Sequence, residues 1–315
     1  MSRNNLSLAA VICAAMALSG AVGFEQSRAL KGSITLSGAW AIYPTAVAWS
    51  EAFQKKYPEV KIDVSAGGAG KGAADAISGM VDIGMVSRDP DPTEIKKGIT
   101  PFYILHDAVY PVVSDKNPAL EGLLKKGIKK NTFSDIYVAG KVTAWDDIVG
   151  MKLNKSIHVY TRSDSCGAAA SWAKYLGDKK QEDLRGVGVY GDPGLLETAR
   201  RDPLGIGFTN FGYIFTREGA VVKGAKIVPI DSNENGKADP DEIYVGRDEA
   251  IKAIETGKYP VTRKNYFFVK GKPDGLVKEF IKYVLSDEGT QVVNEVGASL
   301  PVSKSERKKN LKNLE

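Results

Sequence analysis

The chain has 315 residues, of which 43% are hydrophobic and 26% charged, and its formal net charge at pH 7 is +5. This length is enough for two domains that each bury a core without disulfide staples. The excess positive charge is spread along the chain and gathers only in 304–312, so the composition does not favour a nucleic-acid partner.

The first residues have the three parts of a secretory signal peptide. Arg3 gives a positive start, 6–18 is an apolar run, and 19–23 holds small residues. The run is shorter than the roughly 20 apolar residues that span a bilayer, which favours a cleaved signal over a retained anchor. We therefore predict a signal peptide over 1–23 and a periplasmic or extracellular mature chain. Cys166 is then its only cysteine, so no intramolecular disulfide is expected.

Beyond residue 30, strand-like and helix-like segments alternate along the chain. Such alternation predicts parallel-rich sheets flanked by helices. The expected strands are 33–37, 60–64, 81–86, 107–113, 157–161, 205–209, 226–229 and 266–269. The expected helices are 45–57, 73–79, 169–176, 276–285 and 289–296, and a glycine-rich turn is expected over 67–72.

This order predicts an α/β protein with two lobes. The chain leaves a first lobe (30–111 and 264–315), forms a second lobe (112–263) and returns. Two crossings between lobes make a hinge, and a ligand is trapped in the cleft between the lobes.

Three loops between a strand and a helix carry the candidate chemistry. They are 37–44, 66–72 and 160–168, and all three are rich in glycine or polar residues. A helix N-terminus offers N–H groups without partners and the positive end of a dipole, so it suits an anion. Glycine lets the backbone approach such a ligand closely.

Charged side chains add to these loops. Arg162 supplies a planar set of donors that matches an oxyanion, and Asp164 is placed to orient it. Ser87 and Arg88 follow the third strand and supply a fourth group. Each feature alone has a plainer interpretation, as a simple turn or a surface ion pair. Together, on one cleft, they predict an anion site.

The order of six segments resembles the periplasmic phosphate-binding proteins of bacterial ATP-driven phosphate uptake systems. The resemblance rests on 38–44, 67–72, 81–88, 140–148, 162–167 and 205–208. It implies a type II periplasmic-binding-protein (venus flytrap) fold without catalysis. It also implies a monomeric receptor that binds inorganic phosphate and passes it to the membrane permease of an ABC importer.

The resemblance also implies where the ligand binds. The implied positions are Ala39, Trp40, Ala69, Gly70, Ser87, Arg88, Arg162, Asp164, Cys166, Gly167 and Ala168. Family members usually carry hydroxyl side chains at several of them, and several have Asp at the position of Arg88. Backbone N–H groups survive these changes, but a different anion (molybdate, sulfate or a carboxylate) becomes an alternative ligand. A second alternative is the same fold reused as an extracellular sensor or interaction protein.

Two of these residues have competing interpretations. Trp40 either stacks over the ligand or fills the space that smaller residues leave. Cys166 is either a nucleophile with His158 as its base, which would make the protein a hydrolase, or a buried, inert thiol, and the latter is favoured.

Residues 231–242 match the twelve-residue EF-hand loop. Oxygen-bearing side chains occupy positions 1, 3, 5 and 9, glycine position 6 and glutamate position 12. The candidate Ca²⁺ ligands are Asp231, Asn233, Asn235, Lys237, Asp239 and Glu242. The alternative is a polar surface turn. The sequence thus predicts a structural calcium ion that stiffens the second lobe, and no other cofactor.

Overall fold

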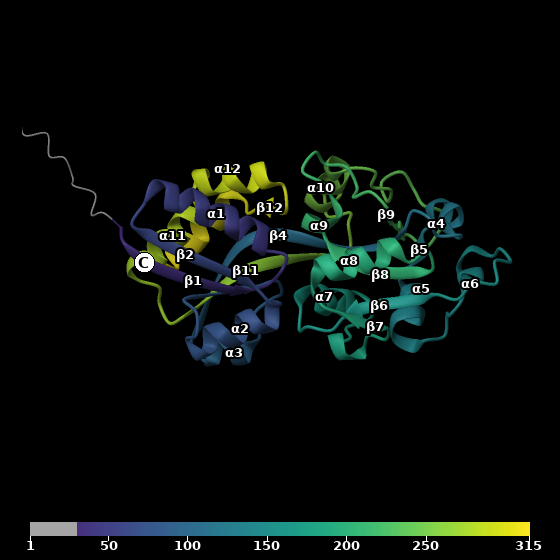
Figure 1. Cartoon of the computed structure of the whole chain (residues 1–315), viewed down its shortest axis with the longest axis horizontal. Helices are drawn as coiled ribbons and strands as arrows, with labels where there is room; N and C mark the ends of the chain where they lie inside the picture. The colour runs from purple at the N-terminus through teal and green to yellow at the C-terminus, as the bar shows by residue number, and fades with distance from the viewer. Residues whose placement is uncertain (1–29) are drawn as a thin grey trace, which may run out of the picture.

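The computed structural model describes residues 30–315, which form two lobes side by side (Figure 1). The predicted signal peptide, 1–23, lies outside the described residues. Within them, no helix is long and apolar enough to cross a membrane.

A single ten-stranded sheet runs through both lobes. Its main order is β2-β1-β3-β11-β4-β8-β6-β7, with β9 and β12 paired to β4. The strands are β1 (Gly32–Gly38), β2 (Val60–Ala66), β3 (Ile83–Val86), β4 (Ile99–Ser114), β6 (His158–Arg162), β7 (Val187–Val189), β8 (Gly205–Asn210), β9 (Ala225–Ile227), β11 (Thr262–Lys270) and β12 (Leu300–Pro301). A separate pair joins β5 (Ile128–Lys129) to β10 (Ile230–Asp231).

The prediction of parallel-rich sheets holds only toward the ends of this large sheet. β1 pairs in parallel with β2 and β3, and β6 pairs in parallel with β7 and β8. In the middle, β11 is antiparallel to both β3 and β4, and β4 is antiparallel to β8. These middle strands are antiparallel because β4 carries the chain into the second lobe and β11 brings it back.

Helices cover both faces of the sheet in the first lobe. Figure 1 places α1, α11 and α12 on one face and α2 and α3 on the other. The helices of this lobe are α1 (Tyr43–Lys56), α2 (Ala69–Ser78), α3 (Pro92–Lys96), α11 (Gly275–Val284), α12 (Asp287–Val296) and α13 (Lys304–Lys312).

In the second lobe, α7 and α8 pack against β8. The helices of this lobe are α4 (Leu120–Lys126), α5 (Lys130–Ser134), the π-helical η1 (Asp135–Ala139), α6 (Trp145–Val149), α7 (Gly167–Tyr175), the 3-10 helix η2 (Gln181–Asp183), α8 (Gly191–Arg201), α9 (Phe211–Ile214) and α10 (Arg247–Glu255).

Each lobe has its own hydrophobic core. One is built around Trp49, Phe53 and Phe280, and the other around Trp145 and Trp172. Burying a large apolar side chain contributes about 1.5–3 kcal/mol, so such residues dominate the stability of each core. Along β4, the side chains pass from the first core to the second between Leu105 and Ala108. The predicted lobe boundaries, at 111/112 and 263/264, stay a prediction.

Two predicted segments differ from the structure. The strand expected over 107–113 is the second half of β4, which has 16 residues. The first half of β4, 99–106, was not predicted as a strand. The turn expected over 67–72 is shorter, since α2 begins at Ala69 after Gly68 (φ 89°). Gly72 is therefore helical, and its lack of a side chain lets α2 lie against the backbone of β3.

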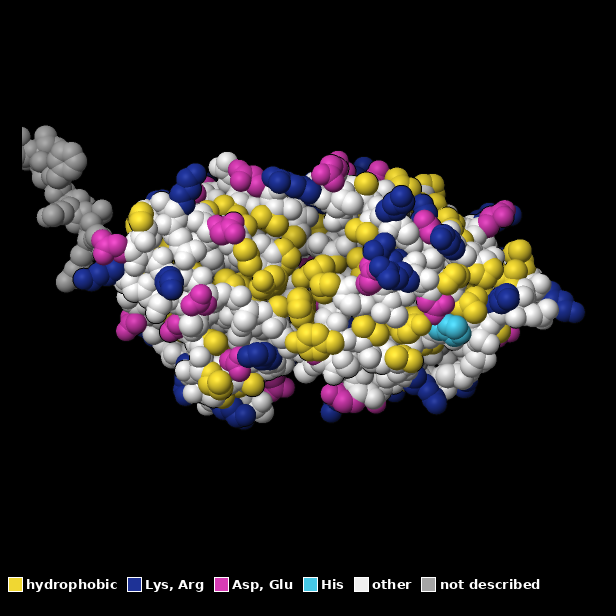
Figure 2. Space-filling model, in the orientation of Figure 1, with side chains coloured by type: hydrophobic (Ala, Val, Ile, Leu, Met, Phe, Trp, Pro, Cys, Tyr) yellow, Lys and Arg dark blue, Asp and Glu magenta, His cyan; other side chains and the backbone are white. Residues whose placement is uncertain are grey.

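The space-filling view shows hydrophobic side chains gathered along the middle of the visible face, where the two lobes meet (Figure 2). The boundary between the lobes is therefore a candidate position for a binding site.

Candidate functional site

The predicted anion loops converge on the boundary between the lobes. The N–H of Gly70, at the start of α2, donates to the carbonyl of Ser165 across the boundary at 3.0 Å. A side chain added at Gly167 would collide with the carbonyl and hydroxyl oxygens of Ser87. The two lobes thus touch directly, in a closed arrangement.

Arg162 lies at the centre of this boundary with its side chain fully buried. Its Nε and Nη2 donate to the two carboxylate oxygens of Asp164 at 2.8 and 2.6 Å. Its Nη1 donates to Asp192 at 2.5 Å. These bonds fit the orienting role predicted for Asp164, which stays a prediction. A guanidinium has five N–H donors, and these bonds use three of them.

The charge of Arg162 is held by its neighbours. Burial opposes the cation and lowers the pKa of Arg162, but Asp192 and Asp164 outweigh burial and the net pKa is raised. Arg162 therefore stays protonated, with its charge balanced by the two acidic side chains that it contacts.

The N-terminus of α7 lies beside Arg162 in the chain. Cys166 caps this helix, because its sulfur accepts the N–H of Ala169 at 3.3 Å. The N–H groups of Gly167 and Ala168, in the first turn, have no acceptor among residues 30–315. These two amides and Arg162 belong to the ligand-binding residues predicted from the sequence, and their binding role stays a prediction.

Trp40 fills the space between the lobes. Its ring meets Tyr190 edge-on, with ring centroids 6.0 Å apart, and a side chain added at Gly191 would lie 3.1 Å from it. Its carbonyl accepts the hydroxyl of Tyr213 at 2.9 Å. These contacts favour the space-filling interpretation of Trp40. Next to it, the N–H of Ala39 donates to the carbonyl of Met85 at 2.8 Å and is not available to a ligand.

Arg88 is turned toward α3. Both of its terminal nitrogens bind the carboxylate of Glu94, at 2.6 and 2.9 Å. Ser87 remains at the boundary against Gly167. Ser87 and Arg162 therefore lie at the lobe boundary, while the charge of Arg88 is balanced by Glu94.

The predicted nucleophile and base do not act on each other. Burial raises the pKa of the Cys166 thiol to about 12, more than nearby Arg162 lowers it. The imidazole of His158 binds Asp202 at 2.6 Å. These contacts support the interpretation of Cys166 as a buried, inert thiol.

A match to a family model now places the chain among known proteins. The model of the PBP superfamily domain matches residues 25–288. The chain belongs to the PBP superfamily. The predicted resemblance and the two-lobed fold are thereby confirmed.

Curated relatives of this PBP superfamily member include two phosphate-binding proteins PstS. The Bacillus subtilis protein is 26% identical over 302 residues, or 91% of each chain. A Staphylococcus epidermidis protein is 27% identical over 285 residues, or 87% of this chain and 81% of the relative.

Solved structures of the same fold include two from phosphate transport systems. One is a putative phosphate ABC transporter substrate-binding protein with bound phosphate from Clostridium perfringens. Its TM-score is 0.69 at 24% sequence identity, and the match covers 86% of this chain and 100% of that chain. The other is an ABC-type phosphate transport receptor from Vibrio cholerae (TM-score 0.63, 20% identity, covering 86% and 100%).

Sequence analysis missed Asp192, the second partner of Arg162. It stands in the first turn of α8, and its other oxygen accepts the N–H of Asn210 at 3.3 Å. The signal was present, because Gly191-Asp192-Pro193 follows a strand in the same way as the three anion loops. A separation of 30 positions in the sequence hid its pairing with Arg162.

The predicted calcium loop has the backbone turns of its motif. The carboxylate of Asp231 accepts the N–H groups of Asn235 and Gly236 at 3.0 and 2.8 Å. Glu242 accepts the N–H of Ser232 at 2.7 Å. Asn233 and Asn235 donate to Asp239, and the N–H of Lys237 donates to Asn235. Among residues 30–315, however, no three His, Cys, Asp or Glu are grouped to hold a metal. The calcium ion stays a prediction.

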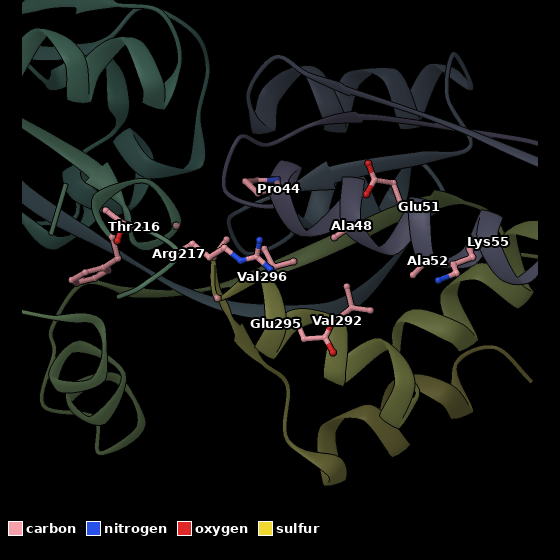
Figure 3. A pocket seen from close by; sticks show the side chains of 14 residues that line it. Pro44, Ala48, Glu51, Ala52, Lys55, Thr216, Arg217, Val292, Glu295 and Val296 are labelled. Carbon is pink, nitrogen blue, oxygen red and sulfur yellow. The ribbon is translucent and has the colours of Figure 1, made fainter. Parts of the chain in front are cut away.

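Two cavities open at the lobe boundary of this PBP superfamily protein. One, of about 610 Å³, lies between α1, α12 and the segment 215–217 (Figure 3). Its wall combines apolar side chains with the charged Glu51, Lys55, Arg217 and Glu295. The other, of about 840 Å³, is bounded by the first residues of α2, the outer side of α7 and the hinge residues 260–263.

Proposed function

We propose that the protein is a solute-binding receptor that captures phosphate, or a related oxyanion, between its lobes for an ABC importer. Arg162 carries the proposal. It is buried between two carboxylates, retains N–H donors, and stands beside the amides of Gly167 and Ala168. The relatives named for phosphate binding, and the solved structure with bound phosphate, point to the same ligand.

The missing hydroxyl groups set the expected strength of binding. Each hydrogen bond to the anion contributes on the order of 1 kcal/mol net, or more when it meets a charge. Ala39, Trp40, Ala69 and Ala168 supply no hydroxyl, so binding relies on backbone amides and Arg162. We therefore expect weaker discrimination among tetrahedral oxyanions than a site with several hydroxyl donors gives.

The proposed role implies where in the cell the protein works. A receptor for an importer works outside the cytoplasmic membrane and meets its permease there, in agreement with the signal peptide predicted over 1–23. We propose that the mature chain acts as a monomer, since one chain supplies both lobes of the site. The same site supports ligand capture rather than catalysis.

Titration calorimetry tests the proposal on the mature protein. Phosphate should bind reversibly, and at 100 times its Kd it should stabilise the fold by about 2.7 kcal/mol. Arg162→Lys keeps the charge but loses the planar set of donors, and we expect at least a hundredfold loss of phosphate affinity. Arg200→Lys changes an arginine of the same lobe that pairs with Glu197 at the surface and serves as the matched control.

Two results would contradict the receptor hypothesis. One is an unchanged affinity in Arg162→Lys. The other is a flat thermal response to phosphate, arsenate, sulfate, molybdate and small carboxylates. The flat response would favour the alternative, an extracellular sensor or interaction protein, because Trp40 already joins the lobes without a ligand's help.

A further inference from the structure

A chain of buried hydrogen bonds leads from Arg162 to β4 and β11, the strands that link the lobes. With its two oxygens, Asp192 accepts Nη1 of Arg162 at 2.5 Å and the N–H of Asn210 at 3.3 Å. The side-chain oxygen of Asn210 accepts Nη2 of Arg263, and the same Nη2 donates to Asp107 at 2.6 Å. None of the five residues is more than 7% exposed. The predicted anion site and the linking strands are therefore joined by one buried polar connection.

Each member of this connection is placed by a different element. Arg263 and Asp107 face each other in the antiparallel pairing of β11 with β4. Asn210 is the last residue of β8, and Asp192 stands in the first turn of α8. A guanidinium bound to a carboxylate presents its donors at fixed angles. Arg263 is thus anchored by Asp107 and in turn fixes the side chain of Asn210.

Stability alone is a poor reason for the charged pair at the end of this connection. Nη1 of Arg263 and Oδ1 of Asp107 are buried and have no hydrogen-bond partner among residues 30–315. Burial raises the pKa of Asp107 more than its contact with Arg263 lowers it. A buried ion pair is often no more stabilising than apolar side chains of similar volume. What the pair does supply is a fixed position for Asn210, and through it for Asp192.

We infer that Asn210 and Arg263 are positioning residues for anion capture. Arg263 anchors Asn210, Asn210 orients the carboxylate of Asp192, and that carboxylate holds the guanidinium of Arg162. Binding is tighter when the groups that contact the ligand are ordered in advance. Breaking the connection should therefore weaken phosphate binding although Arg162 itself is unchanged. This inference rests on the proposed function, because it assumes that the anion binds at Arg162.

Titration calorimetry with inorganic phosphate on the mature protein tests this inference. Asn210→Ala removes the acceptor for Arg263 and keeps the backbone N–H, and we expect about a tenfold loss of phosphate affinity. Arg263→Lys keeps the charge beside Asp107 but loses the planar donors that bridge to Asn210, and it should lose a similar factor. Because both variants break the same link, the double variant should bind phosphate within about twofold of the weaker single variant.

The matched control is Asn117→Ala. Asn117 is a buried asparagine of the second lobe, and its side chain accepts the N–H of Ala119 at 2.8 Å. Its loss should lower the Tm in the same way as Asn210→Ala, because each variant removes one buried acceptor. Phosphate affinity should stay at the wild-type value in the control.

NMR of protein with isotope-labelled arginine reports on Arg162 directly. The Nε–H signal of Arg162, assigned by its loss in Arg162→Lys, belongs to a group bonded to Asp164 and should exchange slowly with water. In Asn210→Ala we expect this exchange to be about tenfold faster or more. In Asn117→Ala it should be unchanged. A purely structural role for Asn210 would lower the Tm without changing this signal.

The outcomes separate the inference from the proposed function. Wild-type phosphate affinity in Asn210→Ala would overturn the inference and leave the receptor function standing, as would single losses that multiply in the double variant. An equal loss in Asn117→Ala would also overturn it, because the cause would then be general destabilisation. If circular dichroism shows that Arg263→Lys does not fold, the contrast between Asn210→Ala and Asn117→Ala gives the result. If the wild-type protein does not bind phosphate, the proposed function fails and the inference fails with it.

Discussion

Arg162 is a buried cation whose partners both stabilise its charge and fix its orientation. Moving an isolated charge into the interior costs several kcal/mol, and partners must offset that cost. Asp164 and Asp192 do so from opposite ends of the guanidinium. Because the two carboxylates hold its plane in place, Arg162 is already oriented before a ligand arrives, which reduces the ordering cost of binding.

Replacing Asp192 should destabilise the protein markedly. Breaking a buried pair costs about 3–5 kcal/mol, and Asn keeps the shape and one acceptor, so we expect about 2–4 kcal/mol for Asp192→Asn. Urea unfolding measures it. The control Glu288→Gln breaks an exposed pair with Lys56 and should cost less than about 1 kcal/mol. Equal losses in the two variants would contradict the structural role of Asp192.

Cys166 should resist alkylation in the folded protein. Burial raises the pKa of its thiol to about 12, so at pH 8 only about one molecule in ten thousand carries the reactive thiolate. Iodoacetamide labelling, followed by mass spectrometry, should be slow in the native state and fast in urea. Rapid labelling of the native protein would show that the thiol is accessible and activated.

Short spacing in the chain decided which site residues could be predicted. Arg162 and Asp164 are two residues apart in one loop, so their ion pair could be inferred from the sequence. Asp192 and Tyr213 reach the site only through the fold of the second lobe. The bond from Arg88 to Glu94 was also missed.

At the scale of elements, periodicity predicted the main strands of the large sheet and five helices, and it missed α8, α10 and most of the short elements. The fully buried second half of β4 was predicted as a strand, whereas its partly buried first half was missed. The start of α2 was placed too late, because glycines that usually end helices here allow close packing against β3.

The loop 231–242 should bind calcium if its oxygens can gather around an ion. At 100 times the Kd, Ca²⁺ would add about 2.7 kcal/mol and raise the Tm by roughly 5–10 °C for a chain of this size. Differential scanning calorimetry with Ca²⁺ and then EDTA measures this shift. Asp231→Asn/Glu242→Gln should abolish it.

The control for the calcium loop is Asp241→Asn, whose side chain binds Lys258 outside the expected ligand set. This variant should keep the shift. A Tm that does not respond to 10 mM Ca²⁺ would identify the segment as a polar surface turn held by its own hydrogen bonds.

At the scale of the whole molecule, the two lobes are held together by direct contacts between them as well as by the hinge strands. Gly70 meets Ser165, Trp40 meets Tyr190, and Tyr213 binds the backbone of Trp40. β4 and β11 link the lobes behind these contacts, and the pair Asp107–Arg263 lies between the strands. Closure therefore depends on a few close approaches that a single side chain can block.

Gly167→Ala should block closure while leaving each lobe folded. The added methyl group would collide with the backbone and hydroxyl of Ser87 across the boundary. Gly167 is the first residue of α7, where alanine is compatible with the helix. We expect an unchanged or slightly raised Tm without ligand, a larger radius of gyration in X-ray scattering, and at least a tenfold loss of phosphate affinity.

Gly194→Ala, whose nearest neighbour is a side-chain atom of Val189 at 3.3 Å, is the matched control and should behave as the wild type. Wild-type phosphate affinity in Gly167→Ala would mean that capture does not require the two lobes to meet at Ser87.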